Sequence, residues 1–326
     1  MFGKNERKNN TKHEIIKYIC KKIFMSVLVV GTVAFDAIET PFGKTDKIVG
    51  GAATYICLSS SFFTNKLNLV SVVGEDFPES AINMLKSKSV DIRGLQIKKG
   101  EKTFFWSGKY HNNMNTRDTL ETQLNVLEKF NPIVPENFKD SEFLMLGNLM
   151  PSTQKKVLNQ MNKKPKLIVL DTMNFWMDLF MDDLKKALKD VDVLTINDEE
   201  ARQLSEEYSL VKAAKVILSM GPKYVIIKKG EHGALLFNNE EVFFAPALPL
   251  EEVFDPTGAG DSFAGGFIGY LAKTNDTSFK NMKKAVIHGS VMASFCVEKF
   301  GTQKLTEINQ KNVDDRINDF VKLVDF

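Results

Sequence analysis

Short apolar runs alternate with amphipathic helical patterns along most of the chain, starting at Ser26. The runs rich in β-branched residues predict strands at Val27–Val30, Leu69–Val73, Phe143–Leu146, Leu167–Leu170, Val193–Ile196 and Tyr224–Ile227. Helical spacing of apolar residues predicts helices at Glu79–Lys88, Thr153–Met161, Asp182–Leu188, Glu199–Glu206 and Val211–Met220. This alternation is typical of a mostly parallel sheet with helices on both faces, which binds its ligands at the carboxyl ends of the strands.

Two further pairs of segments are predicted to form hairpins. Ala234–Phe237 and Val242–Ala245 flank a turn-prone pair of asparagines, which predicts an antiparallel edge to the sheet. Gly94–Lys98 and Thr103–Tyr110 flank a short polar sequence that contains one glycine, which predicts a second hairpin. We expect this second hairpin and residues near Ile38–Ile48 to form a small sheet that projects from the main body as a lid.

The start of the chain differs in composition from the rest. Residues 1–25 are rich in lysine and asparagine, and we predict that they form a non-catalytic extension. Residues 26–326 are predicted to form one domain, with lid segments at about 36–50 and 92–112. A basic pair before the first apolar run resembles the start of a signal peptide. The run is too short to span a bilayer, and its β-branched residues favour a buried strand.

Composition and charge narrow the function classes. The chain has 326 residues, enough to bury a large core, and its formal net charge of +2 indicates no polyanionic partner. It has no basic stripe with interleaved aromatic residues, so we expect neither a nucleic-acid partner nor a membrane partner. The three cysteines, Cys20, Cys57 and Cys296, are far apart, and neither they nor the four histidines have zinc-site spacing. We therefore expect no disulfide scaffold and a cytoplasmic location.

A glycine-rich turn carries the strongest functional signal. The sequence Asp255-Pro256-Thr257-Gly258-Ala259-Gly260-Asp261 precedes small and aromatic residues at helical spacing, so the turn opens a helix. The first N–H groups of a helix lack partners and lie at the positive end of its dipole, which makes them an anion site. Asp261 beside this site could take the proton from a hydroxyl that attacks a phosphoryl group. The alternative is that Asp261 is only a helix cap and the glycines only form the turn.

The order Asp-x-Thr-Gly-Ala-Gly-Asp before such a helix resembles the C-terminal signature of the ribokinase-like (PfkB) family of carbohydrate and nucleoside kinases. The resemblance implies an α/β fold, a three-layer sandwich with a mostly parallel central sheet and a small β lid. It also implies transfer of the γ-phosphoryl group of ATP, with Mg²⁺, to a hydroxyl of a sugar or sugar-like substrate. In this reading Asp261 is the general base, and the N–H groups of Gly258, Ala259, Gly260 and Asp261 stabilise the transferred group.

The resemblance places the acceptor substrate near the first strand. Asp36 matches an aspartate that accepts hydrogen bonds from substrate hydroxyls, and Gly50-Gly51 matches a diglycine that lets the backbone approach a sugar ring. The family pattern usually continues with an asparagine, whereas this chain has Thr54-Tyr55. On the predicted lid, Trp106 could cover a substrate ring or belong to the core of the lid, and Arg117 could face the cleft.

Two neighbouring strands end in polar residues on the nucleotide side. Asn197 and Glu200 resemble the Asn-x-x-Glu motif of the family, which positions Mg²⁺ and phosphate through water, and they also have the spacing of a capping box. Asp171 and Asn174 follow the preceding strand and are further polar candidates at the same edge.

The last predicted parallel strand leads into a glycine turn that resembles the one under the nucleotide in this family. In it, Lys228, Gly230 and Gly233 are candidate ATP contacts. Lys228 alternates with Lys229 along the strand, and the pattern does not decide which lysine faces the nucleotide. Thr257 is a further candidate ATP contact.

The sequence also bears on a cation, on alternative functions and on the oligomeric state. Asp255 matches a position that binds a monovalent cation in several family members, so K⁺ could activate this enzyme. A nucleoside of the adenosine type is the alternative acceptor, because an aromatic lid could stack on a base. A non-catalytic ligand-binding relative would not need the carboxylate of Asp261, and an NAD-binding enzyme would carry its glycine fingerprint after the first strand. An exposed lid sheet could also pair with a second copy to form a homodimer.

Overall fold

The computed structural model describes residues 24–325. The predicted extension at residues 1–25 falls almost entirely outside these residues, as does Cys20. The main sheet has nine strands in the order β14-β13-β12-β11-β10-β9-β1-β5-β6. Their bounds are β1 (Val27–Val30), β5 (Leu67–Gly74), β6 (Val90–Lys98), β9 (Phe143–Leu146), β10 (Leu167–Asp171), β11 (Val193–Asn197), β12 (Tyr224–Lys228), β13 (Ala234–Phe237) and β14 (Val242–Ala245). The strands from β12 to β6 are parallel, while β13 and β14 form the predicted antiparallel edge.

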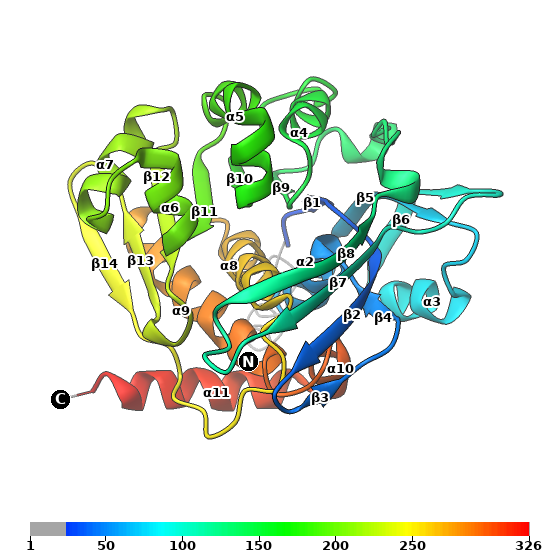
Figure 1. The fold of residues 1–326 in the computed structure, drawn as a ribbon. Helices are drawn as coiled ribbons and strands as arrows, with labels where there is room; N and C mark the ends of the chain where they lie inside the picture. The colour runs from blue at the N-terminus through cyan, green and yellow to red at the C-terminus, as the bar shows by residue number, and fades with distance from the viewer. Residues whose placement is uncertain (1–23, 326) are drawn as a thin grey trace, which may run out of the picture.

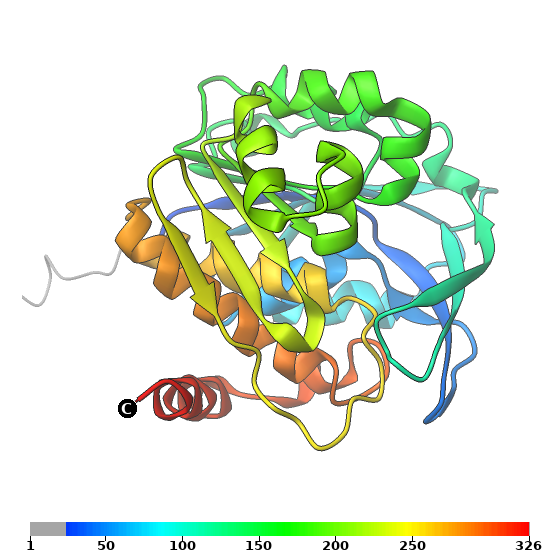
Figure 2. The same cartoon turned by 60° about the vertical axis from the view of Figure 1, so that its left-hand side comes forward.

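Helices cover both faces of this sheet (Figures 1 and 2). One face carries α4 (Pro151–Leu158), α5 (Asn174–Leu188), α6 (Asp198–Ser205) and α7 (Leu210–Ser219), and the short 3-10 turns η1 (Asn125–Leu127) and η2 (Glu136–Phe138). The other face carries α2 (Ala52–Ser60), α3 (Glu79–Ser87), α8 (Ala259–Thr274) and α9 (Phe279–Cys296), with α10 (Gln303–Glu307) and α11 (Gln310–Leu323) outside them. The predicted strands and helices are confirmed, except that α5 begins at Asn174 and bends at Phe180 instead of beginning at Asp182.

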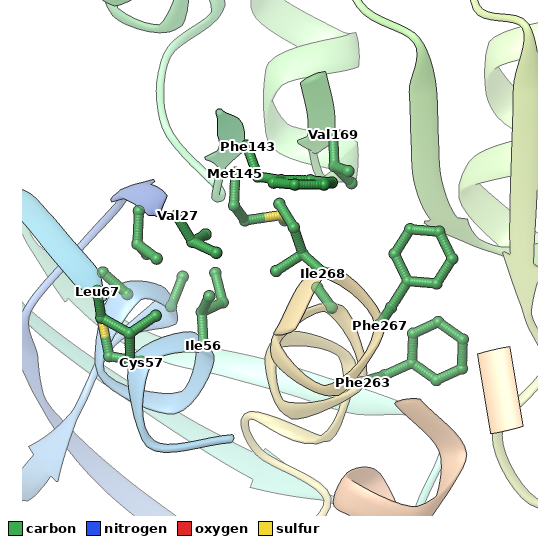
Figure 3. Close-up of a cluster of buried hydrophobic side chains, with 14 of the residues drawn as sticks. Val27, Ile56, Cys57, Leu67, Phe143, Met145, Val169, Phe263, Phe267 and Ile268 are labelled. Carbon is green, nitrogen blue, oxygen red and sulfur yellow. The ribbon is translucent and has the colours of Figure 1, made fainter. Parts of the chain in front are cut away.

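Successive side chains of each strand point to opposite faces of the main sheet, so a hydrophobic core forms on each face. On one face, Phe143, Met145 and Val169 share one core with Phe263, Phe267 and Ile268 of α8, and Ile268 points toward them (Figure 3). The residues between them point to the other face and pack against α4 to α7. The N-terminus of α8 is thereby held at the carboxyl ends of the strands, where open sheets bind ligands.

Glycines set the distance between α8 and its two neighbours. A Cβ at Gly265 would lie 2.5 Å from the carbonyl oxygen of Ile56 in α2, and one at Gly266 would lie 2.6 Å from that of His288 in α9. Both distances are below van der Waals contact, so only glycine allows α8 to pack this closely between α2 and α9. In the described part of the chain, no helix is both long enough and apolar enough to cross a membrane.

A second sheet of five strands forms the lid. Its order is β3-β2-β7-β8, with β4 paired to β2. The bounds are β2 (Ala34–Thr40), β3 (Gly43–Lys44), β4 (Ile48–Gly50), β7 (Phe105–Tyr110) and β8 (Arg117–Gln123). The strands β7 and β8 run in front of α8 in Figure 1. The expected lid segment at 36–50 lies in this sheet, whereas the segment at 92–112 is divided between the two sheets.

The predicted hairpin between Gly94–Lys98 and Thr103–Tyr110 is wrong. Residues 94–98 belong to β6, which pairs in parallel with β5 at the edge of the main sheet. Residues 105–110 form β7, which pairs with β2 and β8. Thr103 explains the difference, because its N–H and hydroxyl both donate to Asp76, and its hydroxyl oxygen accepts from Gly74 N–H. These contacts carry the chain from one sheet to the other.

Candidate active site

The glycine turn begins α8 as predicted. Gly258 has φ 77°, in the left-handed region that glycine tolerates best, and the helix starts at Ala259. The N–H of Ala259 donates to the carbonyl oxygen of Pro256 (3.1 Å), and the N–H of Asp261 bonds to its own carboxylate. Among residues 24–325 the N–H groups of Gly258 and Gly260 have no partner. Of the four donors expected at this turn, these two are therefore directly available to an anion.

Asp261 lies in the first turn of α8, where it is largely buried. Burial, and after it the neighbouring charge of Asp171, raise the pKa of its carboxyl to about 7, although Lys228 and Arg117 act in the opposite direction. A carboxyl that titrates near neutral pH can accept a proton from a hydroxyl and release it afterwards.

Asp36 and the diglycine meet at the lid base. The carboxylate of Asp36 is 5% exposed and accepts a hydrogen bond from the N–H of Gly51. A Cβ at Gly50 would lie 1.8 Å from Asp36 Oδ2, so the carboxylate occupies the space that a side chain there would need. Burial, together with the charges of Asp255 and Asp261, raises the pKa of Asp36 to about 7. The structure thus brings the predicted acceptor residues together beside Asp261.

The inner face of the lid carries aromatic side chains over this region. Trp106 is the neighbour of Asp36 in the pairing of β7 with β2, so both project from the same face of the lid sheet. Trp106 is half-buried, and its ring lies across Gly108. The hydroxyl of Tyr110, two residues further on, is 3.2 Å from Thr257 Oγ1 in the glycine turn. The lid sheet therefore faces the turn with its aromatic side.

The tip of the lid reaches the nucleotide side. A Cβ at Gly230 would lie 2.4 Å from the side-chain oxygen of Asn115, in the loop between β7 and β8. Arg117 follows at the start of β8, where its positive charge lowers the pKa values of Asp261 and Glu200. The lid sheet thus extends from Asp36 to the glycine turn at Gly230.

Asn197 and Glu200 form the capping box that their spacing predicts. Asn197 Oδ1 accepts from the N–H of Glu200 (2.7 Å), and Glu200 Oε2 accepts from the N–H of Asn197 (2.8 Å). Burial raises the pKa of Glu200 to about 7, although Lys228 opposes the shift. Within residues 24–325, no three His, Cys, Asp or Glu side chains lie close enough to hold a metal ion alone. The side-chain contacts of Asn197 and Glu200 in this structure are therefore those of a helix cap.

The structure places one of the two lysines beside the glycine turn. Lys228 ends β12, and its Nζ lies 3.1 Å from Asp171 Oδ1, on the face of the sheet that α8 covers. Lys229 belongs to the turn that follows, and Gly230 and Gly233 have φ angles of 54° and 79°. These left-handed conformations form the tight turn that the sequence predicts beneath a nucleotide.

Asp255 stabilises the glycine turn from below. Its carboxylate is fully buried and accepts hydrogen bonds from the N–H groups of Thr257 and Gly301, both at 2.8 Å. The carbonyl oxygen of Thr257 accepts from the thiol of Cys296 (3.4 Å). The contacts of Asp255 in this structure are thus structural, because they join the glycine turn to the loop at Gly301.

Sequence reasoning missed three residues of the site. Tyr55 lies under the turn, with its ring carbons 2.5 Å from where a Cβ of Gly258 would be. Its hydroxyl is buried and has no hydrogen-bond partner within residues 24–325. Tyr55 lies four residues after Gly51, one turn further along α2, and this spacing could have identified it as a neighbour of the diglycine. Tyr110, whose hydroxyl contacts Thr257, and Thr195, which donates to Asp171 Oδ1 (2.8 Å), had no comparable signal, because these contacts join distant parts of the chain.

Known proteins were compared with this chain in sequence and in structure. A profile of pfkB family carbohydrate kinases matches residues 26–309. A cytidine kinase of Thermococcus kodakarensis is 32% identical over 288 residues, which cover 86% of this chain and 99% of that kinase. A nucleoside kinase of Methanothermobacter thermautotrophicus is 28% identical over 85% of this chain and 91% of its own length. The crystal structure of the Methanocaldococcus jannaschii nucleoside kinase, an archaeal member of the ribokinase family, has a TM-score of 0.73 at 21% identity, covering 91% of this chain and 99% of that one. The fold is therefore ribokinase-like, as predicted.

Proposed function

Since the chain belongs to the pfkB family of carbohydrate kinases and is a phosphotransferase that acts on a sugar or nucleoside hydroxyl, we propose that its acceptor is the ribose of a nucleoside. The observation that carries this proposal is the pairing of Asp36 with Trp106 on the inner face of the lid. A carboxylate suits two neighbouring ribose hydroxyls, and an aromatic ring beside it suits a flat base. The kinases for cytidine and other nucleosides among the relatives agree with this reading.

Asp261 serves as the general base. It accepts the proton of the acceptor hydroxyl while the oxygen forms a bond to the γ-phosphorus of ATP. The bond between that phosphorus and the β–γ bridging oxygen breaks, and ADP leaves with the electron pair. Because burial raises the pKa of Asp261 to about 7, the proton can be accepted and released near neutral pH.

The turn and the lid together stabilise the transferred group. The N–H groups of Gly258 and Gly260 are available as donors, and Ala259 and Asp261 hold the backbone of the turn in place. Arg117 adds a positive charge from the lid. Since Asn115 also lies against Gly230, closure of the lid shields ATP from water as it completes the site.

Nucleotide and metal lie at the carboxyl ends of β11 and β12. Lys228, Gly230, Gly233 and Thr257 contact ATP in this proposal, and Asn197 and Glu200 orient the water shell of Mg²⁺. When bound, Mg²⁺ neutralises charge on the β- and γ-phosphate oxygens.

Three finer features complete the proposal. K⁺ binds beside Asp255 and supports activity, which a comparison of K⁺ with Li⁺ salts would test. The exposed strand β8, at the edge of the lid sheet, pairs with a second copy in a homodimer, which a mass measurement in solution would test. The protein works in the cytoplasm, which fractionation would test.

The decisive experiment measures ADP release from ATP and Mg²⁺ with nucleosides, free sugars and sugar phosphates as acceptors. We expect nucleosides to exceed free ribose in kcat/KM. The Asp261→Asn variant should lose at least about 10²-fold in kcat with the best acceptor, because it lacks the base, yet should bind ATP as the unaltered protein does. Preference for free sugars would contradict the nucleoside assignment, and an active Asp261→Asn variant would contradict the role of the base.

A further inference from the structure

Three adjacent parallel strands place polar side chains on the face of the sheet that α8 covers. Val169 and Val193 pack into the core on this face, and alternation puts Asp171 and Thr195, two residues further along β10 and β11, on the same side. Lys228 ends β12, the next strand, and projects from this face too. The group formed by Asp171, Thr195 and Lys228 thus lies between the sheet and the N-terminus of α8.

The contacts within this group fix the position of the lysine. Asp171 Oδ1 accepts from Thr195 Oγ1 (2.8 Å) and from Lys228 Nζ (3.1 Å). The side chains of Lys228 and Asp171 are only 17% and 9% exposed. The main chain of Asp171 is held as well, because Gln154 donates from its Nε2 to the carbonyl oxygen of Asp171 (3.0 Å). A buried ion pair supported in this way has little freedom to move.

The ammonium group of Lys228 lies directly against the glycine turn. A Cβ at Gly260 would be 2.9 Å from Lys228 Nζ. Burial lowers the pKa of Lys228, but the carboxylates of Asp171, Glu200 and Asp261 outweigh that effect, so the lysine stays charged. A fixed positive charge therefore lies beside one of the two available N–H groups of the turn.

We propose that Asp171 is a positioning residue, which holds the Lys228 ammonium against the Gly258–Asp261 turn and so adds a fixed positive charge to the site of phosphoryl transfer. This proposal rests on the proposed function. The sequence offered Asp171 only as a polar candidate at the nucleotide edge. Its Oδ1 is already bound to Thr195 and Lys228, so we assign the carboxylate to the lysine.

The two charges act on the base in opposite directions. The carboxylate of Asp171 raises the pKa of Asp261, and the ammonium of Lys228 lowers it. When kcat/KM is measured against pH, removing Lys228 should therefore move the acidic limb of the profile to higher pH, since Asp261 would lose its proton less readily. Removing the charge of Asp171 should move the limb to lower pH. A purely structural ion pair predicts loss of stability in both variants and an unchanged kcat in the folded protein.

The test compares Lys228→Met and Asp171→Asn with Lys229→Met, which removes a lysine from the adjacent position. We expect Lys228→Met to raise the KM for ATP and to lower kcat about 10²-fold, because it removes a cation from the transferred group. Lys228→Arg should recover part of the loss, and Lys229→Met should keep the unaltered profile. If the acidic limbs of Lys228→Met and Asp171→Asn both stay in place, the proposal is overturned.

Two controls separate the possible failures. An active Asp261→Asn variant would refute the proposed function itself. If Asp261→Asn is inactive but the acidic limbs of Lys228→Met and Asp171→Asn do not move, only the role of Asp171 is refuted. If Lys228→Met does not fold, Thr195→Val supplies a second measurement, because it removes one hydrogen bond to Asp171 and keeps both charges. It should lower kcat and leave the limb near its original pH, and an unchanged kcat would count against the proposal.

Discussion

Gly50→Ala should disable acceptor binding through a single contact. The new Cβ would lie 1.8 Å from Asp36 Oδ2 and 2.6 Å from its Cγ. A relaxed C···O contact needs about 3.3 Å, so the carboxylate would have to retreat by roughly 1.5 Å. It is 5% exposed and bonded to the N–H of Gly51, so little space is free for that movement. A displacement of this size in a positioning group costs about 10²-fold in rate.

The assay is kcat/KM for the best acceptor at saturating ATP, together with the KM for ATP, which should not change. Gly100→Ala is the matched control, because Gly100 has φ 75° but a Cβ there meets nothing within 4 Å. It should lose stability from backbone strain and keep its activity. In an Asp36→Ala background, Gly50→Ala should have almost no further effect, since its target is gone. The reasoning is refuted if Gly50→Ala keeps kcat/KM within about threefold of the parent, or costs as much without Asp36 as with it.

Two more predictions concern charge. Arg117→Met should lower kcat about 10²-fold, because the lid would no longer bring a guanidinium to the transferred group. Arg117→Lys should retain part of the rate, and both variants are measured at saturating substrates. An unchanged kcat in Arg117→Met would remove Arg117 from the mechanism. Asp36, Glu200 and Asp261 have pKa values raised to about 7, so the folded protein binds these protons more tightly than the unfolded chain. Stability without substrate should therefore fall as pH rises from about 4 to 7, by at most about 1.4 kcal/mol per pH unit for each group. Urea midpoints across this range would show it, Asp36→Asn should reduce the slope, and a rising stability would contradict the shifts.

Local pattern was sufficient for most of the main sheet. Apolar β-branched runs such as Val27–Val30 and Phe143–Leu146 can only be buried between two layers of helices, so their positions follow from the sequence. The strand β8 gave no such signal, because all of its residues are polar or exposed and none alternates with a buried neighbour. The hairpin rule failed at residues 94–110, since the bonds of Thr103 to Asp76 depend on a loop that is distant in sequence.

At the candidate active site, too, contacts between residues that are distant in sequence could not be predicted. Asp261, Asp36 and the glycines were identified because their motifs are contiguous, whereas the partners that position them come from elsewhere in the chain. Nothing near Lys228 in sequence indicates that Asp171 and Thr195 hold it, since that contact depends on the order of β10, β11 and β12. The chain has Thr54-Tyr55 where the family pattern led us to expect an asparagine, and only the structure shows that the ring of Tyr55 lies against Gly258.

The positive charges of Lys228 and Arg117 belong to different parts of the fold. Lys228 is held by the sheet through Asp171, so its charge is present whatever the lid does. Arg117 belongs to the lid, and it lowers the pKa of Asp261 because β8 lies over the cleft in this structure. In the proposed mechanism Asp261 would therefore ionise most readily with the lid in this position, since both charges then act on it. Asn115 of the same lid segment lies against Gly230, so in the proposed mechanism closure of the lid would favour ionisation of Asp261 and cover the phosphates together.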